Sequence, residues 1–176
     1  MAGPGAIGSL WRLIAVQAGG AHEANLDSVK VAAAVIIREG KILICQRKAG
    51  DTHEFEWEFP GGKVERRESF AGALQRELEE ELAIQARIGP EIHREEFQYP
   101  GRRPLVLAFF RVEEFYGEPV NQVFEQIVWE DPQKLPEYNF LKGDVPFIQR
   151  LAAGDFFEIR LAGANPSNGT TERAVD

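Results

Sequence analysis

The chain has 176 residues, of which 44% are hydrophobic and 27% charged, which fits one globular domain that can bury a core. Its formal net charge of -8 argues against a nucleic-acid polymer as the main ligand, because phosphate contacts need a basic surface. No apolar run approaches the roughly 20 residues of a membrane-spanning helix, so no membrane association is expected.

The two ends of the chain differ in composition from its middle. Residues 1–27 are rich in Ala and Gly without a sustained hydrophobic period, and we expect a loosely ordered extension there. No basic residue precedes its short apolar stretch and Arg12 interrupts that stretch, so it does not resemble a secretory signal. We expect residues 28–155 to form the domain and residues 156–176 to form a C-terminal tail.

The first part of the domain has strand composition. Val29–Ile37 and Lys41–Arg47 are apolar runs on either side of the turn Glu39-Gly40, which predicts a hairpin. The single cysteine, Cys45, lies within the second run. It excludes an intramolecular disulfide and a cysteine metal cluster, and it fits a reducing, cytoplasmic compartment. Glu54–Phe59 alternates charged with aromatic residues and predicts a half-buried strand.

Further strands and two helices are expected downstream. The additional strands are Ala86–Ile88, Glu95–Tyr99, Leu105–Glu113 and Ile127–Glu130. Ser69–Leu82 has helical period, because apolar side chains recur there at every fourth residue. A closing helix starts near Asp144. Strands dominate with two helices inserted, an order that indicates an α+β fold.

Three glutamates gather on one face of the first predicted helix. Glu77, Glu80 and Glu81 stand at positions i, i+3 and i+4, whereas Glu79 lies about 200° from Glu77 and should point to solvent. A solvated polar face is the ordinary interpretation of such a pattern. A cation site is the alternative, since Mg²⁺ prefers carboxylate oxygens that it shares with substrate phosphates. The helix alone leaves both open.

The spacing around these glutamates resembles the Nudix box. The pattern G-x5-E-x7-R-E-U-x-E-E-x-x-U, with U a bulky apolar residue, is formed by Gly62, Glu68, Arg76, Glu77, Leu78, Glu80, Glu81 and Ile84. The full box has Gly one place before the last apolar residue, where this chain has Ala83. Glycine there adopts a left-handed backbone conformation, which costs a residue with a Cβ atom roughly 1 kcal/mol or more.

The resemblance implies a fold, a cofactor and site residues. The fold is the Nudix fold, a mixed β-sheet sandwiched between helices (α/β/α), and the cofactor is Mg²⁺, for which Mn²⁺ can substitute. The implied metal ligands are Gly61, Glu77, Glu80, Glu81 and Glu125, and the implied catalytic residues are Glu77, Glu80 and Glu125. Glu118 is an alternative to Glu125, and an uninvolved surface glutamate is a third possibility. Glu68 and Arg76 are expected to form a structural ion pair, or a surface pair worth little.

Outside the box the chain resembles the MutT branch of this family and the related cytidine triphosphate pyrophosphohydrolases. The likeness runs from about Val29 to Leu151, and its clearest parts are Ile44–Arg47, Trp57–Lys63 and Gly117–Pro119. The substrate-binding residues that it implies are Arg47, Glu58, Phe59, Pro60, Gly61, Lys63 and Asp144. Asp144 matches an Asn that reads the base edge in MutT, while the cytidine-preferring relatives have Asp. Aspartate is also an ordinary helix N-cap.

These likenesses predict a magnesium-dependent hydrolase that converts a nucleoside triphosphate into the monophosphate and pyrophosphate. The first candidate substrate is 8-oxo-dGTP, which implies sanitation of the nucleotide pool. CTP or a modified dCTP is the alternative substrate, and a catalytically silent Nudix module that senses nucleotides is the alternative from another class. A small-molecule nucleotide is the expected partner, with no nucleic-acid polymer and no obligate protein partner.

Overall fold

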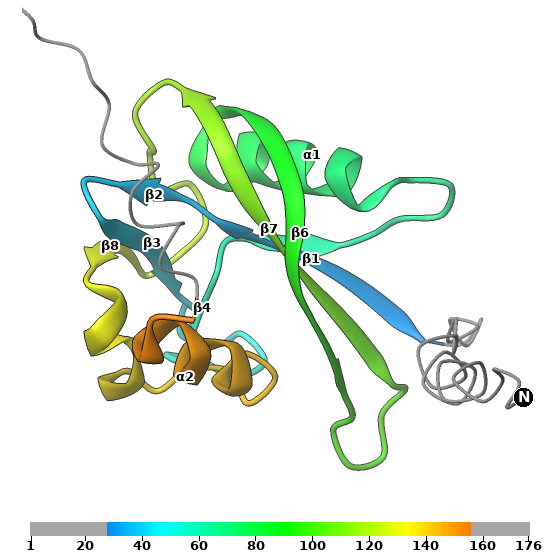
Figure 1. Cartoon of the computed structure of the whole chain (residues 1–176). Helices are drawn as coiled ribbons and strands as arrows, with labels where there is room; N and C mark the ends of the chain where they lie inside the picture. The colour runs from blue at the N-terminus through cyan, green and yellow to red at the C-terminus, as the bar shows by residue number, and fades with distance from the viewer. Residues whose placement is uncertain (1–27, 156–176) are drawn as a thin grey trace, which may run out of the picture.

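The computed structural model describes residues 28–155, and the extension and tail expected at residues 1–27 and 156–176 lie outside them. The elements in chain order are β1 (Val29–Val35), β2 (Ile37–Arg38), β3 (Lys41–Gln46), β4 (Trp57–Glu58), β5 (Gly61–Lys63), α1 (Phe70–Leu82), β6 (Gln85–Phe97), β7 (Leu105–Tyr116), β8 (Gln126–Glu130), the 3-10 helix η1 (Pro132–Glu137) and α2 (Val145–Ala153). Figure 1 shows how they are arranged. No helix of this described part is long and apolar enough to cross a membrane.

One mixed sheet forms the centre of the domain. Its strand order is β5-β1-β7-β6, in which β1 pairs parallel with β7 while β5 and β6 add antiparallel strands. A second sheet is built around β3, which pairs antiparallel with β2, β4 and β8. The expected hairpin is only partly correct, because Ile37 and Arg38 pair with β3 whereas Val29–Val35 joins the central sheet. Two sheets combined with helices α1 and α2 confirm the α+β class.

Alternate side chains of β1 pack toward opposite helices. Ala32 and Ala34 belong to the apolar cluster that contains the buried leucines of α1. Ala33 and Val35 belong to a separate cluster that contains Phe147 of α2. Because successive side chains of a strand point to opposite faces of its sheet, the central sheet lies between α1 and α2 (Figure 1). This is the α/β/α arrangement that the resemblance implied.

The strand predicted over Glu54–Phe59 is wrong for its first half. Only Trp57 and Glu58 are extended, and the preceding residues form a turn in which His53 and Phe55 have φ values of 64° and 61°. The turn folds back on the end of β3, since the Phe55 N–H donates to the Arg47 carbonyl at 3.1 Å. Left-handed residues cannot continue a strand, and an alternating pattern does not reveal them.

The strands predicted at Ala86–Ile88 and Glu95–Tyr99 are one strand, β6. Its partner β7 runs alongside for its whole length, and the register shifts between Ile88 and His93 absorb the proline at position 90. A bulge lets a strand accommodate a proline, because the residue that lacks an N–H is left out of the ladder. Tyr99 lies beyond the strand, in the turn before β7.

Helix α1 has the boundaries that the sequence predicts. The Ser69 hydroxyl accepts a hydrogen bond from the Gly72 N–H at 3.0 Å, which caps the first turn. At the other end Ala83 is left-handed, with φ 55° and ψ 33°, and its N–H donates to the Glu79 carbonyl at 3.1 Å. Ala83 therefore adopts the conformation that the box glycine would have.

Replacing Ala83 by glycine should stabilise the protein. Glycine relieves the steric cost of the left-handed conformation, and a gain of about 1 kcal/mol in the free energy of unfolding is expected. Thermal unfolding should show a midpoint higher by a few degrees. The matched control is Ala71→Gly in the first turn of the same helix, which should lower the midpoint because the backbone there is right-handed. A lower midpoint for Ala83→Gly would contradict the argument.

Candidate active site

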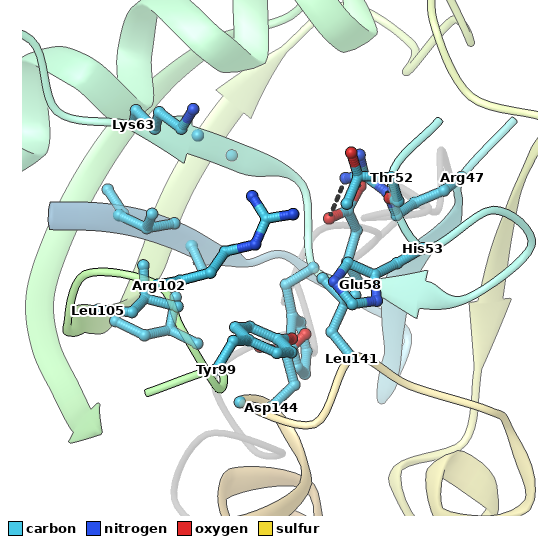
Figure 2. Close-up of a pocket in the computed structure, with 18 residues that line it drawn as sticks. Arg47, Thr52, His53, Glu58, Lys63, Tyr99, Arg102, Leu105, Leu141 and Asp144 are labelled. Atoms are coloured by element: carbon cyan, nitrogen blue, oxygen red, sulfur yellow. Dashed lines mark hydrogen bonds and ion pairs between the residues drawn. The ribbon is translucent and has the colours of Figure 1, made fainter. Parts of the chain in front are cut away.

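Arg47 and Glu58 form an ion pair at the junction of β3 and β4. The Arg47 Nη1 donates to both carboxylate oxygens of Glu58, at 3.0 and 2.9 Å. The Arg47 Nε also donates to the Thr52 carbonyl at 2.8 Å, which ties the turn after β3 to this pair. Burial raises the pKa of Glu58, and the nearby Arg47 guanidinium opposes that rise. The pair is drawn in Figure 2.

A pocket of about 360 Å³ opens beside this ion pair (Figure 2). It is bounded by β1, β5, the turn after β3, the turn between β6 and β7, and the segment that leads into α2. Its lining includes the predicted substrate-binding residues Arg47, Glu58, Phe59, Gly61, Lys63 and Asp144. Of the predicted binding residues only Pro60 is not in the lining, and its carbonyl accepts a hydrogen bond from the Ala34 N–H at 2.8 Å.

Asp144 is buried at the base of the pocket. It occupies the N-cap position of α2, yet its side chain makes no capping hydrogen bond, and only 4% of the residue is exposed. Its carboxyl group accepts a hydrogen bond from the Phe59 backbone. Burial raises the pKa of Asp144 well above its ordinary value, and the negative charge of Glu58 raises it further. The simple helix-cap interpretation of this residue therefore does not apply.

Two of the box glutamates lie directly against β5. The Glu81 Oε2 accepts a hydrogen bond from the Gly61 N–H at 3.0 Å. The Glu77 carboxylate covers Gly62 so closely that a Cβ atom at that position would be 2.4 Å from Glu77 Cδ. Gly61 also has no room for a side chain, because its Cβ atom would be 2.2 Å from the Ala32 carbonyl oxygen. The two glycines let the backbone pass between β1 and the acidic side chains.

Arg76 holds the loop before α1 onto the helix. It pairs with both carboxylate oxygens of Glu68 at 3.1 Å, and its Nη1 also lies 2.8 Å from Glu77 Oε1 and 3.5 Å from Glu80 Oε2. These contacts lower the pKa of Glu68 and raise that of Arg76. The expected ion pair is thus present, and Arg76 additionally reduces the repulsion within the glutamate cluster.

The box carboxylates fit a divalent cation by their chemistry, although they do not converge on one point in this structure. Among residues 28–155 no three acidic, His or Cys side chains are grouped closely enough to hold a metal ion. The Glu80 side chain is 61% exposed, while Glu77 and Glu81 face β5. Burial, together with the charges of Glu58 and Glu77, raises the pKa of Glu81 to about 8. A cation would relieve that repulsion, and hard carboxylate oxygens are the ligands that Mg²⁺ prefers.

The loop that carries Glu125 lies beside the end of α1. The Gln122 N–H donates to the Glu81 carbonyl at 3.0 Å, and the Glu125 N–H donates to the Gln46 carbonyl at 2.8 Å. The Glu125 side chain is exposed. The alternative, Glu118, pairs with Arg38 of β2 at 2.7 Å. The structure therefore places the backbone of Glu125 near the site, whereas the Glu118 carboxylate pairs with Arg38 instead.

Several residues of the pocket were not predicted as binding residues. Thr52 and His53 come from the turn after β3, Tyr99 and Arg102 from the turn between β6 and β7, and Leu141 from the segment before α2. The His53 and Tyr99 rings lie 5.0 Å apart at the pocket wall. The sequence offers a signal only for His53, as a histidine before the binding strand. Thr52 lies in the same turn as His53, whereas Tyr99, Arg102 and Leu141 come from segments that are distant in the sequence.

Comparisons with known proteins agree with this geometry. The model of the NUDIX domain family matches residues 28–151. The CTP pyrophosphohydrolase of Escherichia coli is 37% identical over 73% of this chain and 94% of its own. The 8-oxo-dGTP diphosphatase of Haemophilus influenzae is 36% identical over 70% of this chain and 90% of its own. The solution structure of the E. coli ORF135 protein superposes with a TM-score of 0.66 at 34% identity, covering 81% of this chain and 96% of that one. The chain belongs to the NUDIX domain family.

Proposed function

We propose that the protein is a magnesium-dependent hydrolase that cleaves a nucleoside triphosphate into the monophosphate and pyrophosphate. The observation that carries this proposal is the packing of Glu77 and Glu81 against β5, beside a pocket with buried Asp144 at its base. The acidic side chains and a nucleotide-sized pocket thereby lie against the same strand, β5. The relatives named as a CTP pyrophosphohydrolase and an 8-oxo-dGTP diphosphatase support the same reaction class.

Each site residue has a role in this proposal. Glu77, Glu80, Glu81, the Gly61 carbonyl and Glu125 would hold Mg²⁺, or Mn²⁺ in its place. The bound cation would offset the negative charge of the diphosphate and help a water molecule attack phosphorus. Arg47 and Glu58 shape the wall of the pocket through their ion pair, and Lys63 offers a positive charge at the end of β5. The ion pair between Glu68 and Arg76 holds the loop before α1 against the helix.

Product analysis tests the reaction class. With Mg²⁺ and a nucleoside triphosphate, ³¹P detection should show inorganic pyrophosphate and the monophosphate in equal amounts, because water adds to one phosphorus as the α–β bridge bond breaks. Reaction in ¹⁸O-labelled water then identifies which phosphorus is attacked. A nucleoside diphosphate with a single orthophosphate would contradict the proposal, and no turnover with any triphosphate would favour a silent binding module.

The preferred base is proposed to be 8-oxoguanine, with cytosine as the second candidate. An ionised carboxylate only accepts hydrogen bonds, whereas a protonated one also donates. Oxidised guanine presents an N7–H donor beside its O6 acceptor, which a protonated Asp144 can serve. The burial of Asp144 favours that protonated form. Cytosine instead offers an amino donor to an ionised Asp144, and the 37% identical CTP pyrophosphohydrolase favours this alternative.

The pH dependence of binding distinguishes the two bases. Because the pKa of Asp144 is raised in the folded protein, its carboxyl group is protonated at low pH and ionises as the pH rises through that pKa. Affinity for 8-oxo-dGMP should therefore fall with rising pH, and Asp144→Asn should flatten the profile. Affinity for CMP should rise instead and suffer from the same substitution. Titration calorimetry with these products at saturating Mg²⁺ measures both profiles, because a bound cation would keep Glu81 ionised over the whole range. If the affinity of neither product changes its pH dependence in Asp144→Asn, Asp144 has only a structural role.

The cellular context follows from the substrate. Hydrolysis of 8-oxo-dGTP would remove an oxidised precursor before DNA replication, which is a sanitising role in the cytoplasm. We also propose that residues 28–155 form the catalytic domain, because α1, α2 and every proposed site residue lie within this described range.

A further inference from the structure

A second hollow adjoins the substrate pocket. It has a volume of about 420 Å³, and it shares part of its wall with the pocket. The shared residues are Lys63, Tyr99, Arg102 and Leu105, and those that line the second hollow alone are Val29, Gly101 and Arg103. The two spaces therefore meet along the end of β5 and the turn between β6 and β7.

The lining of this hollow is cationic. Lys63, Arg102 and Arg103 are exposed and carry positive charge, and none of the lining residues within the described range 28–155 is acidic. This concentration of cations stands out in a chain whose formal net charge is -8. Cations gathered along a concave surface attract an anion more strongly than the same charges spread over a convex one.

Strand β5 leads from the glutamates of α1 to this hollow. Gly61 contacts Glu81, Gly62 lies under Glu77, and the Lys63 carbonyl accepts a hydrogen bond from Arg76 at 3.2 Å. A polyphosphate chain that starts beside Gly61 and follows β5 reaches the ammonium group of Lys63. Figure 2 shows Lys63 on β5 and the Arg102 guanidinium reaching into the space between β5 and Glu58.

We propose that the hollow lined by Lys63, Arg102 and Arg103, the distal anion site, binds the terminal phosphate of a nucleoside triphosphate. Arg103 is then a specificity-determining residue that favours triphosphates over diphosphates. The inference rests on the proposed function, because it assumes that the nucleotide binds with its phosphates along β5. Cations held by Glu77 and Glu81 would offset the charge of the phosphates beside these residues, whereas a third phosphate would need the separate positive charge of this site.

Steady-state kinetics with a triphosphate and a diphosphate of the same base test the proposal. Arg103→Gln should raise KM for the triphosphate about tenfold, which is the loss expected for one hydrogen bond to a charged group. The kcat value should stay unchanged, because the contact is equally strong in the ground state and the transition state. KM for the diphosphate, or its inhibition constant if it is not hydrolysed, should stay as in the wild type.

Two matched variants complete the design. Arg103→Lys keeps the charge and should retain most of the preference for the triphosphate. Arg66→Gln removes an exposed arginine that lies in the loop after β5 and lines neither space. This variant should leave KM for both nucleotides unchanged. A thermal midpoint for each variant shows whether the fold is kept. Equal effects on the two nucleotides, or an Arg103→Gln variant that behaves like Arg66→Gln, would overturn the inference.

The wild-type protein offers a second test that does not depend on any variant. Raising the ionic strength screens exposed charges, so the ratio of triphosphate to diphosphate affinity should fall as salt is added. A ratio that is insensitive to salt would contradict a distal anion site. Failure of the proposed function looks different, because then the wild type would hydrolyse no nucleoside triphosphate under any of these conditions.

Discussion

Glu81→Gln should reduce kcat by about 10²- to 10³-fold, because it removes one negative charge from the shell that would hold the cation in the transition state. Glu80→Gln is expected to act in the same direction. Glu79→Gln is the matched control from the same helix, and it should retain nearly full activity because Glu79 is exposed and faces away from β5. Initial rates at saturating Mg²⁺ and nucleotide measure the difference.

Thermal unfolding distinguishes a loss of catalysis in Glu81→Gln from a loss of the folded structure. In metal-free protein the pKa of Glu81 is raised to about 8, above its unfolded value, so ionisation of this group destabilises the fold increasingly as the pH rises toward 8. Glutamine cannot ionise and can still accept the hydrogen bond from the Gly61 N–H. Glu81→Gln should therefore unfold at the same or a higher temperature than the metal-free wild type at pH 8, while added Mg²⁺ should stabilise the wild type more than the variant. A dead Glu79→Gln beside an active Glu81→Gln would contradict the assigned helix face.

Gly62→Ala should nearly abolish hydrolysis while leaving the fold intact. The added Cβ atom would be 2.4 Å from the Glu77 carboxyl carbon, so that side chain must move away from β5. The displaced group is the end of a flexible side chain, and its movement costs the fold little. It would, however, remove a proposed cation ligand, and a loss of about 10²-fold in kcat is expected. Rates and thermal midpoints of the same preparation provide the comparison.

Gly72→Ala is the matched control for the glycine. Its Cβ atom would lie 3.1 Å from the Ser69 hydroxyl, within a helical turn where alanine is favoured over glycine. This variant should keep its activity. An active Gly62→Ala enzyme would show that Glu77 does not need to cover β5 during catalysis, and an unfolded one would show that the close approach is structural.

Local sequence patterns predicted the parts of the molecule that local physics determines. The leucine repeat and Ser69 define α1, and the spacing of Glu77 and Glu81 places both carboxylates on the face that meets β5. The left-handed Ala83 was predicted as well, from one mismatch to the box. These features depend on residues within a few helical turns of each other.

Features that depend on distant segments could not be predicted in this way. Tyr99 and Arg102 reach the pocket only because β6 and β7 pair over their whole length and project their turn beside β5. The burial of Asp144 follows from the packing of α2 against the central sheet and from its contact with the Phe59 backbone. The strand predicted over Glu54–Phe59 failed in its first half because the left-handed Phe55, like His53 just before it, leaves no trace in hydrophobic periodicity.

The central sheet separates two tasks of the molecule. Helix α1, which carries the glutamates, packs on one face of the sheet, whereas α2, whose N-cap residue is Asp144, packs on the other face. If Asp144 contacts the base as proposed, substitutions at the start of α2 would alter which base is recognised without displacing the groups on α1. Such a division would make substrate choice easy to change during evolution while the chemistry is inherited.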